Sequence, residues 1–235
     1  MASVVVMSGG GIKGAVVATR AAKAEPVVLL HIDYGQPSAT AELSALHAMA
    51  QALPHARLWE VQMPHVLDLQ RTFDSSGSAG ETDEPPKSNR GRELSIPVLR
   101  GLLPVLAATG VQCALRVGAS RVSLGLSQHC DAAHLGLPSG GGRSTRGREF
   151  VHALNIMIEA LLGRRGAVEV DTPLIDANCG QIHQLGIRYE VPFEKTWSCT
   201  SASRRPCGRC AACGERAAAF AERRLMDPIL AATSA

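Results

Sequence analysis

Four cysteines near the end of the chain have the spacing of a metal site. Cys199, Cys207, Cys210 and Cys213 follow the pattern C-x7-C-x2-C-x2-C. Thiolates this close together along a chain suit a tetrahedral ion with no open coordination position. Four arginines nearby would offset the thiolate charge: Arg204, Arg205, Arg209 and Arg216. The spacing predicts a structural zinc site rather than two disulfides. An iron–sulfur cluster is the competing interpretation, since thiolates alone do not select the metal.

The three other cysteines, Cys113, Cys130 and Cys179, are left over from this pattern. The opening MASVVVMSGG lacks the basic flank and long apolar run of a secretory signal. We therefore expect a cytoplasmic protein with reduced thiols, because disulfides are rarely kept in the cytosol. No stretch approaches the roughly 18 unbroken apolar residues of a membrane-spanning helix, so no membrane association is expected.

Two of these cysteines lie in contexts that allow a chemical role. His129, Cys130, Asp131 and His134 form the run HCDAAH, which has ligand types for a second metal site, although a loop cluster that binds nothing is the simpler interpretation. Cys179 is a possible nucleophile, but the sequence shows no base beside it, which favours an inert thiol.

A glycine-rich turn near the start has the composition of an anion site. The segment SGGGIKG, residues 8–14, leaves an apolar β-branched run and enters a run of helix formers. Such a turn points backbone N–H groups and the positive end of a helix dipole at a bound phosphate. A tight turn without a ligand is the alternative. The predicted phosphate-binding residues are Ser8, Gly9, Gly10, Gly11, Lys13 and Gly14.

The elements around this turn predict an α/β fold. The first part of the chain alternates strands at 4–7, 27–32 and 57–61 with helices at 15–24 and 40–53. A helix at 96–117 kinked at Pro104, a strand at 121–126, a helix at 149–162, a strand at 168–170 and a short helix at 180–186 follow. This rhythm is typical of a Rossmann-like, doubly wound parallel sheet.

The chain divides at the metal-site segment. We predict a nucleotide-binding domain over residues 1–190 and a zinc-binding C-terminal element with a helix over 191–235. Two polar, aperiodic stretches near 74–92 and 136–147 are predicted to be mobile loops. The first is either a lid over a ligand or a tolerated insertion, because composition does not separate the two.

Ligands of doubly wound sheets bind beyond the carboxyl ends of the strands. The second predicted strand ends in HIDYGQ, which places Asp33, Tyr34 and Gln36 at that edge beside the glycine turn. With 235 residues, 46% apolar content and a formal charge of +3, the chain can bury a substantial core and has no basic tail. Nucleic acid is therefore not an expected direct partner, whereas a phosphate-bearing small molecule is.

The order of motifs along nearly the whole chain resembles the 7-cyano-7-deazaguanine synthase family of queuosine biosynthesis, within the pyrophosphatase-loop class of ATP enzymes. The resemblance is carried by the SGG turn, HIDYGQ, IPVLRG, REFVHALN, DTPLIDAN and TWSC with CGRCAACGERAAAF. It implies an ATP-dependent ligase that activates 7-carboxy-7-deazaguanine by adenylation and converts it with ammonia to the amide and then the nitrile. It also implies structural zinc, magnesium and a homodimer.

The resemblance assigns roles to individual residues. The glycine turn would hold ATP, and we predict Lys13 and Asp33 as catalytic residues. The residues in the positions of the family's substrate pocket are Tyr34, Gln36, Arg100, Arg148 and Glu149.

Three departures from the family pattern fall on the nucleotide side. Ile12 and Lys13 replace the Asp and the second Ser of the SGGxDS loop, Gly101 replaces an Asn, and 178–181 lack the usual Lys and Glu. Two alternatives therefore stay open: a paralogue that binds a deazapurine or serves as an assembly subunit without ATP turnover, and an enzyme acting on another substrate. The turn GGGIKG also resembles the oxyanion loop of patatin-like lipases, but no GxSxG nucleophile motif occurs.

Overall fold

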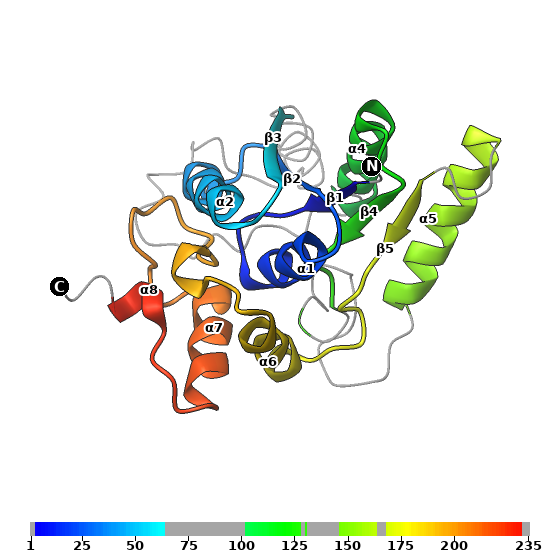
Figure 1. Cartoon of the computed structure of the whole chain (residues 1–235). Helices are drawn as coiled ribbons and strands as arrows, with labels where there is room; N and C mark the ends of the chain where they lie inside the picture. Colours follow the sequence, from blue (N-terminus) through cyan, green and yellow to red (C-terminus); the bar gives the residue numbers. More distant parts are fainter. Residues whose placement is uncertain (1–2, 64–101, 128–129, 131–145, 164–167, 232–235) are drawn as a thin grey trace, which may run out of the picture.

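The computed structural model describes residues 3–63, 102–127, 130, 146–163 and 168–231 (Figure 1). Its centre is a five-stranded sheet in the order β3-β2-β1-β4-β5. The strands are β1 (Val4–Met7), β2 (Val27–Asp33), β3 (Ala56–Gln62), β4 (Arg121–Leu124) and β5 (Glu169–Asp171). All four pairings are parallel, and the chain winds outward from β1 in both directions. The prediction of a doubly wound, Rossmann-like sheet is confirmed.

Helices cover both faces of the sheet. They are α1 (Ile12–Ala22), α2 (Ala39–Ala52), α4 (Leu102–Val117), α5 (Arg146–Leu162), α6 (Cys179–Tyr189), α7 (Ala211–Ala221) and α8 (Pro228–Ala231), with a 3-10 turn η1 (Phe193–Lys195). Because side chains alternate along a strand, Val4 and Val6 of β1 face α1, α2 and α6, whereas Val5 faces α4 and α5. Each face therefore has its own apolar core.

Several element boundaries differ from those predicted. The described part of α4 runs over Leu102–Val117, and residues 96–101 of the predicted helix lie outside the described residues. Helix α6 begins at Cys179, one residue earlier than predicted, because Asn178 and Gln181 form a capping box there, and it continues to Tyr189, where Glu190 ends it in a left-handed conformation. Residues 74–92 and 136–145 lie outside the described residues, and 146–147 are the first residues of α5.

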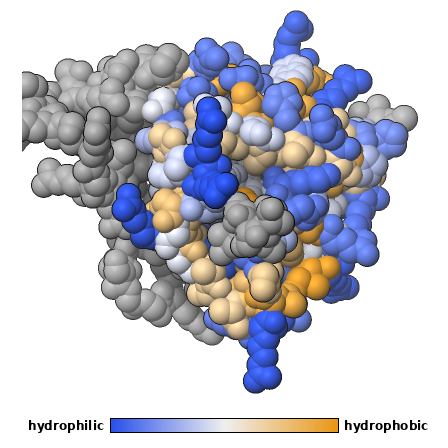
Figure 2. Space-filling model, turned by 90° about the vertical axis from the view of Figure 1, so that its left-hand side faces the viewer, coloured by the Kyte–Doolittle hydropathy of each residue, from blue (hydrophilic) through white to orange (hydrophobic). Residues whose placement is uncertain are grey.

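The C-terminal segment packs against the same core as the sheet. Val191, Phe193 and Phe220 are buried in the cluster that contains Val4 and Val16. Figure 2 shows the side of the molecule that carries α2, α7 and α8, with hydrophilic side chains over much of this face and hydrophobic ones gathered in its lower part. A domain boundary at residue 190 stays a prediction. Within the described ranges, no helix is long and apolar enough to cross a bilayer.

Arg216 has a different partner from the one predicted. Instead of facing the cysteine sulfurs, its guanidinium forms a two-pronged ion pair with Asp227, with N–O distances of 2.7 and 2.9 Å. It also donates to the hydroxyl of Thr196 at 2.7 Å and to the carbonyl of Phe193 at 3.0 Å. Both charged side chains are only 5% exposed, so this pair fixes α7 against η1 and α8 inside the protein.

Candidate functional site

The glycine turn connects β1 to α1 at the carboxyl edge of the sheet. Gly10 adopts a positive φ of 76°, and its N–H donates to the hydroxyl of Ser8 at 3.1 Å. The N-cap of α1 is Gly11, which has no side chain to cap the helix, and no acidic residue lies in the first turn of α1. The first N–H groups of α1 and the positive end of its dipole are therefore suited to an anion.

Two close approaches explain why glycine occupies particular positions around this turn. A Cβ on Gly14 would lie 2.2 Å from the Ser8 hydroxyl and 2.8 Å from the Ser8 Cβ. A Cβ on Gly125, just after β4, would lie 2.8 Å from the backbone nitrogen of Gly14. The loop, the first turn of α1 and the end of β4 are thus packed backbone against backbone, which gives the turn one defined shape.

A cavity of about 460 Å³ opens beside the turn. Its wall combines the glycine turn and Lys13, the end of β4, the start of α6 and part of α7. Tyr34, Glu42 and Trp197 border it as well. This volume lies within the range of small-molecule sites, which are commonly about 300–1,000 Å³. The predicted anion site therefore lies in the wall of a pocket large enough for a nucleotide or a purine-like base.

The HIDYGQ segment forms a tight turn at the end of β2. Asp33 accepts a hydrogen bond from the Gly35 N–H at 2.9 Å, and Gln36 accepts one from the Tyr34 N–H at 2.9 Å. Gln36 is 5% exposed and donates to the carbonyl of Ile32. The side chains of Asp33 and Gln36 thus shape the turn, and of the three predicted residues here only Tyr34 borders the cavity.

Glu42 is a site residue that sequence analysis missed. It lies in the first turn of α2, and its carboxylate accepts hydrogen bonds from Gln36 at 2.9 Å and from Ser38 at 2.5 Å. The same carboxylate lies 3.2 Å from the buried His31 ring and directly beneath Gly9. Burial, and then the charge of Glu42, raise the pKa of Tyr34 to about 12. Tyr34 consequently keeps its proton and can donate a hydrogen bond into the cavity.

Of the other predicted pocket residues, the two that the structure describes, Arg148 and Glu149, are not brought to this cavity. Arg148 is exposed in the first turn of α5 and pairs with Asp176, and this pair raises the pKa of the guanidinium. Neither Arg148 nor the neighbouring Glu149 borders the cavity. Arg100 and Gly101 lie outside the described residues, as do His129, Asp131 and His134. The substrate roles of Arg100, Arg148 and Glu149 stay predictions.

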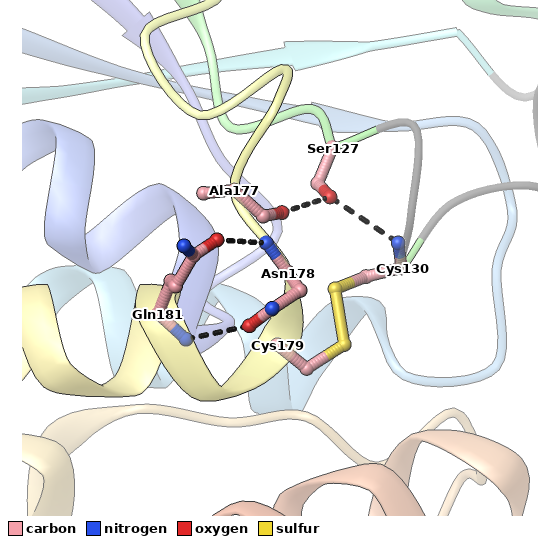
Figure 3. The surroundings of a disulfide bond; sticks show 6 residues. All are labelled: Ser127, Cys130, Ala177, Asn178, Cys179 and Gln181. Carbon is pink, nitrogen blue, oxygen red and sulfur yellow. Dashed lines mark hydrogen bonds between the residues drawn. A yellow bond between two sulfur atoms is a disulfide. The ribbon is translucent and has the colours of Figure 1, made fainter. Parts of the chain in front are cut away.

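Two of the left-over cysteines border the cavity as a disulfide. Figure 3 shows the bond between Cys130, which follows β4, and Cys179, the first residue of α6. The expectation that all seven thiols are reduced was therefore wrong for this pair. The two cysteines are 49 positions apart in sequence. Only the fold brings them together, and no spacing rule predicts a contact of this kind.

The four predicted metal ligands come together at the start of α7. The sulfurs of Cys199, Cys207, Cys210 and Cys213 all lie within 4.8 Å of one another. Tetrahedral zinc with bonds of about 2.3 Å places its sulfurs about 3.8 Å apart, so the four thiols fit the ion. The backbone N–H of Arg209 lowers the pKa of Cys207 to about 6, whereas burial raises the pKa of Cys213. The convergence of the four cysteines is confirmed, and zinc as the ion stays a prediction.

Trp197, two residues before the first of the four cysteines, connects the metal-site segment to the glycine turn. Trp197 packs in one buried cluster with three of the cysteines, and its indole N–H donates to the carbonyl of Cys199 at 2.7 Å. Its backbone N–H donates to the carbonyl of Gly10 at 2.8 Å. The conformation of the glycine turn thus depends on the metal-site segment.

His183 is a second cavity residue that the sequence did not single out. It is 1% exposed, stacks on Phe193 and meets Phe220 edge-on, and neither ring nitrogen has a hydrogen-bond partner among the described residues. Burial, then the charges of Arg223 and Arg216, lower the pKa of His183. The ring is therefore held neutral.

This neutral ring predicts a stability change in mild acid. Protonation of His183 occurs more readily in the unfolded chain, at a pKa of about 6.5, than in the folded protein. Above about pH 6.5 the His183 ring is neutral in both states and does not lower the free energy of unfolding. As the pH falls from about 6.5 toward the lowered pKa of the folded protein, the unfolded chain binds the proton first, and the free energy of unfolding decreases. In thermal unfolding scans at several pH values, His183→Phe should lose less stability than the unaltered protein between neutral and mildly acidic pH. If the stability of the two proteins falls equally with pH, a neutral His183 in the folded protein is contradicted.

Comparison with known proteins decides the family. The model of the family described as queuosine biosynthesis protein QueC matches residues 2–224. The chain belongs to the QueC family. A 7-cyano-7-deazaguanine synthase of Koribacter versatilis is 31% identical over 235 residues, covering 97% of this chain and 92% of the relative. The synthase of Acidobacterium capsulatum is 28% identical over 230 residues, covering 96% and 94%.

One similar solved structure is the U34-tRNA thiolase NcsA from Methanococcus maripaludis with its [4Fe-4S] cluster. The match covers 95% of this chain and 65% of the thiolase chain. The TM-score is 0.44 and the identity 10%, so the likeness is remote. Membership of the QueC family therefore comes from sequence, and the Rossmann-like fold comes from the parallel sheet itself.

Proposed function

We propose that this QueC-family protein is an ATP-dependent carbon–nitrogen ligase that converts a 7-carboxy-7-deazaguanine-like carboxylate, with ammonia, to the amide and the nitrile. The observation that carries the proposal is the glycine turn in the wall of a nucleotide-sized cavity, in a chain whose relatives are named 7-cyano-7-deazaguanine synthase. ATP would supply the activation that turns a carboxylate oxygen into a leaving group.

The chain's own residues would divide the work as follows. The N–H groups of the turn and of the first turn of α1 would hold phosphate oxygens, with Lys13 adding a positive charge at the cavity wall. Neutral Tyr34 would donate a hydrogen bond to the bound base. Asp33 and Gln36 would keep Tyr34 in place through their turn. The proposed roles of Lys13 and Asp33 in catalysis rest on the family resemblance.

The carboxylates present do not fit a magnesium site of the SGGxDS type. Ile12 occupies the position of the loop Asp and packs against the apolar core. Among the described residues, the acids that border the cavity are Glu42 and Glu215. Glu42 already accepts hydrogen bonds from Ser38 and Gln36 and contacts His31. We therefore assign no step to magnesium.

Ile12 also favours a second candidate function. A hydrocarbon cannot replace a metal-binding carboxylate, whereas the glycine turn and the uncapped start of α1 keep the backbone N–H groups that would bind phosphate. A paralogue that binds a nucleotide or a deazapurine without turnover fits this combination. The homodimer, the cytoplasmic location and the absence of a direct nucleic-acid partner stay predictions for either function.

One assay separates the two candidates. The protein is incubated with 7-carboxy-7-deazaguanine, ammonia, magnesium and ATP, and AMP and nitrile are followed by mass spectrometry, with ATP binding measured by calorimetry. Turnover supports the ligase; binding without AMP release supports the non-catalytic paralogue. Gly14→Ala should weaken ATP binding by about tenfold or more, because its Cβ would lie 2.2 Å from the Ser8 hydroxyl and displace the turn. Gly214→Ala, on α7 with open space around the added Cβ, is the matched control.

A further inference from the structure

The Cys130–Cys179 disulfide joins two walls of the ligand cavity. Cys130 follows the β4 segment that packs on Lys13 and Gly14, and Cys179 opens α6. Both residues border the cavity, and both are partly exposed. Among the described cysteines the other five are free: one is buried in α4, and four form the metal cluster. The bond is therefore separate from the metal site and open to small molecules.

Hydrogen bonds hold the two cysteines together independently of the sulfur–sulfur bond. The Ser127 hydroxyl donates to the carbonyl of Ala177 at 2.7 Å and accepts from the Cys130 N–H at 3.2 Å (Figure 3). On the other side, Asn178 and Gln181 exchange hydrogen bonds of 2.8 and 2.9 Å that fix the start of α6. None of these bonds involves a sulfur atom, so we expect the two thiols to stay adjacent when the disulfide is cleaved.

Two thiols that the fold holds side by side form a disulfide much more readily than two distant thiols, because the entropy cost of bringing them together has already been met by folding. Cys179 also lies at the start of an 11-residue helix, where the dipole stabilises a thiolate. The thiolate is the form that attacks disulfides. The two thiols are close together, they are accessible from the cavity, and Cys179 lies at a helix start. These three features favour a disulfide that exchanges with small thiols over a permanent cross-link.

We propose that Cys130 and Cys179 are a redox-active pair in the wall of the ligand cavity, whose reaction partners are low-molecular-weight thiols and disulfides of the glutathione type. In the oxidising direction the Cys179 thiolate attacks such a disulfide, forms a mixed disulfide and releases one thiolate. The Cys130 thiolate then attacks the Cys179 sulfur, forms the Cys130–Cys179 bond and releases the second thiolate. The two protein protons end on the two released thiols, and the small disulfide is reduced.

The position of the pair has a consequence for binding. Because both cysteines border the cavity, a molecule that fills it should block access of a small thiol to the disulfide. Occupancy by ATP, which rests on the function proposed above, should therefore slow reduction of the bond. The exchange itself does not depend on that function.

The first experiment equilibrates the full-length, zinc-loaded protein in glutathione buffers of graded ratio, followed by acid quench, alkylation and peptide mass spectrometry. We expect the Cys130–Cys179 peptide pair to pass reversibly between disulfide and two alkylated thiols while zinc content stays constant. Ser127→Ala should shift the midpoint toward the dithiol by about fivefold or more, because both hydrogen bonds of the Ser127 hydroxyl, to the Ala177 carbonyl and from the Cys130 N–H, are lost. Cys113→Ala, in buried α4, should leave the midpoint unchanged.

Two results would overturn the proposal: thiols that stay free at every glutathione ratio, or a bond that is reduced only when the protein unfolds. The second experiment measures the rate of reduction by glutathione with and without saturating ATP. Slower reduction with ATP places the pair at the ligand. If calorimetry shows that ATP binds and the rate is unchanged, the cavity location of the pair fails. If ATP does not bind, the proposed function fails, and the glutathione titration alone decides on the pair.

Discussion

Cys210→Ser should remove the metal and destabilise the protein by about 4 kcal/mol or more, a loss typical of structural metal sites. At roughly 2–4 °C per kcal/mol for a chain of this size, Tm should fall by about 8–16 °C. Cys210 is the N-cap of α7, where serine is a favoured residue, so the substitution keeps the helix start and removes only the sulfur ligand. Zinc content by metal analysis and unfolding by calorimetry measure both effects on one sample.

Cys113→Ala provides the control for this experiment, since Cys113 is a buried free cysteine outside the cluster. It should keep the full metal content and lose only about 1 kcal/mol. If the Cys210 variant loses its metal and unfolds at the original temperature, the ion has no structural role. Iron in place of zinc in the purified protein would leave the stability argument intact and change the identity of the metal.

Arg216→Leu should destabilise the protein by about 3–5 kcal/mol, because it leaves the Asp227 carboxylate buried without its counter-charge. The variant also loses the bonds from the guanidinium to Thr196 and Phe193. Chemical denaturation monitored by circular dichroism gives the change in free energy. Arg188→Leu, an exposed arginine on α6, should change stability by less than about 0.5 kcal/mol.

A double variant tests whether the buried charge is the cause. Replacing a buried ion pair by apolar residues is often close to neutral, so Arg216→Leu/Asp227→Leu should recover much of the loss. Recovery should be incomplete, because the Phe193 carbonyl and the Ile229 N–H also lose a partner. A double variant less stable than Arg216→Leu would show that shape rather than unpaired charge dominates at this position.

The parallel sheet and the glycine turn could be predicted because their signals are local. Val4–Met7 begins with three β-branched valines and leads into the glycine turn, and the alternation of strands and helices is typical of a doubly wound sheet. The boundary of α6 was also visible in principle, because Asn178 and Gln181 are three positions apart in a capping-box pattern. The four clustered cysteines could be predicted for the same reason: their spacing alone limits how far apart the sulfurs lie.

The remaining parts of the site depend on tertiary contacts. Glu42 reads as an ordinary acid in the first turn of a helix, and only the fold places it beneath Gly9 and against His31. Cys130 and Cys179 meet because the segment after β4 and the start of α6 lie at the same cavity. Arg216 lies three residues after Cys213 and nevertheless pairs with Asp227. The two side chains are buried together, and only the folded chain brings them into contact.

The hydrogen bond from Trp197 to the Gly10 carbonyl joins the cysteine-cluster segment to the glycine turn, so metal occupancy and the nucleotide affinity proposed above would be thermodynamically linked. If loss of the ion loosens Trp197, the glycine turn loses the hydrogen bond to its Gly10 carbonyl, and its affinity for a nucleotide falls. By reciprocity, a bound nucleotide would then raise the affinity for the ion by the same factor. Zinc starvation would then lower the affinity for ATP before the protein unfolds.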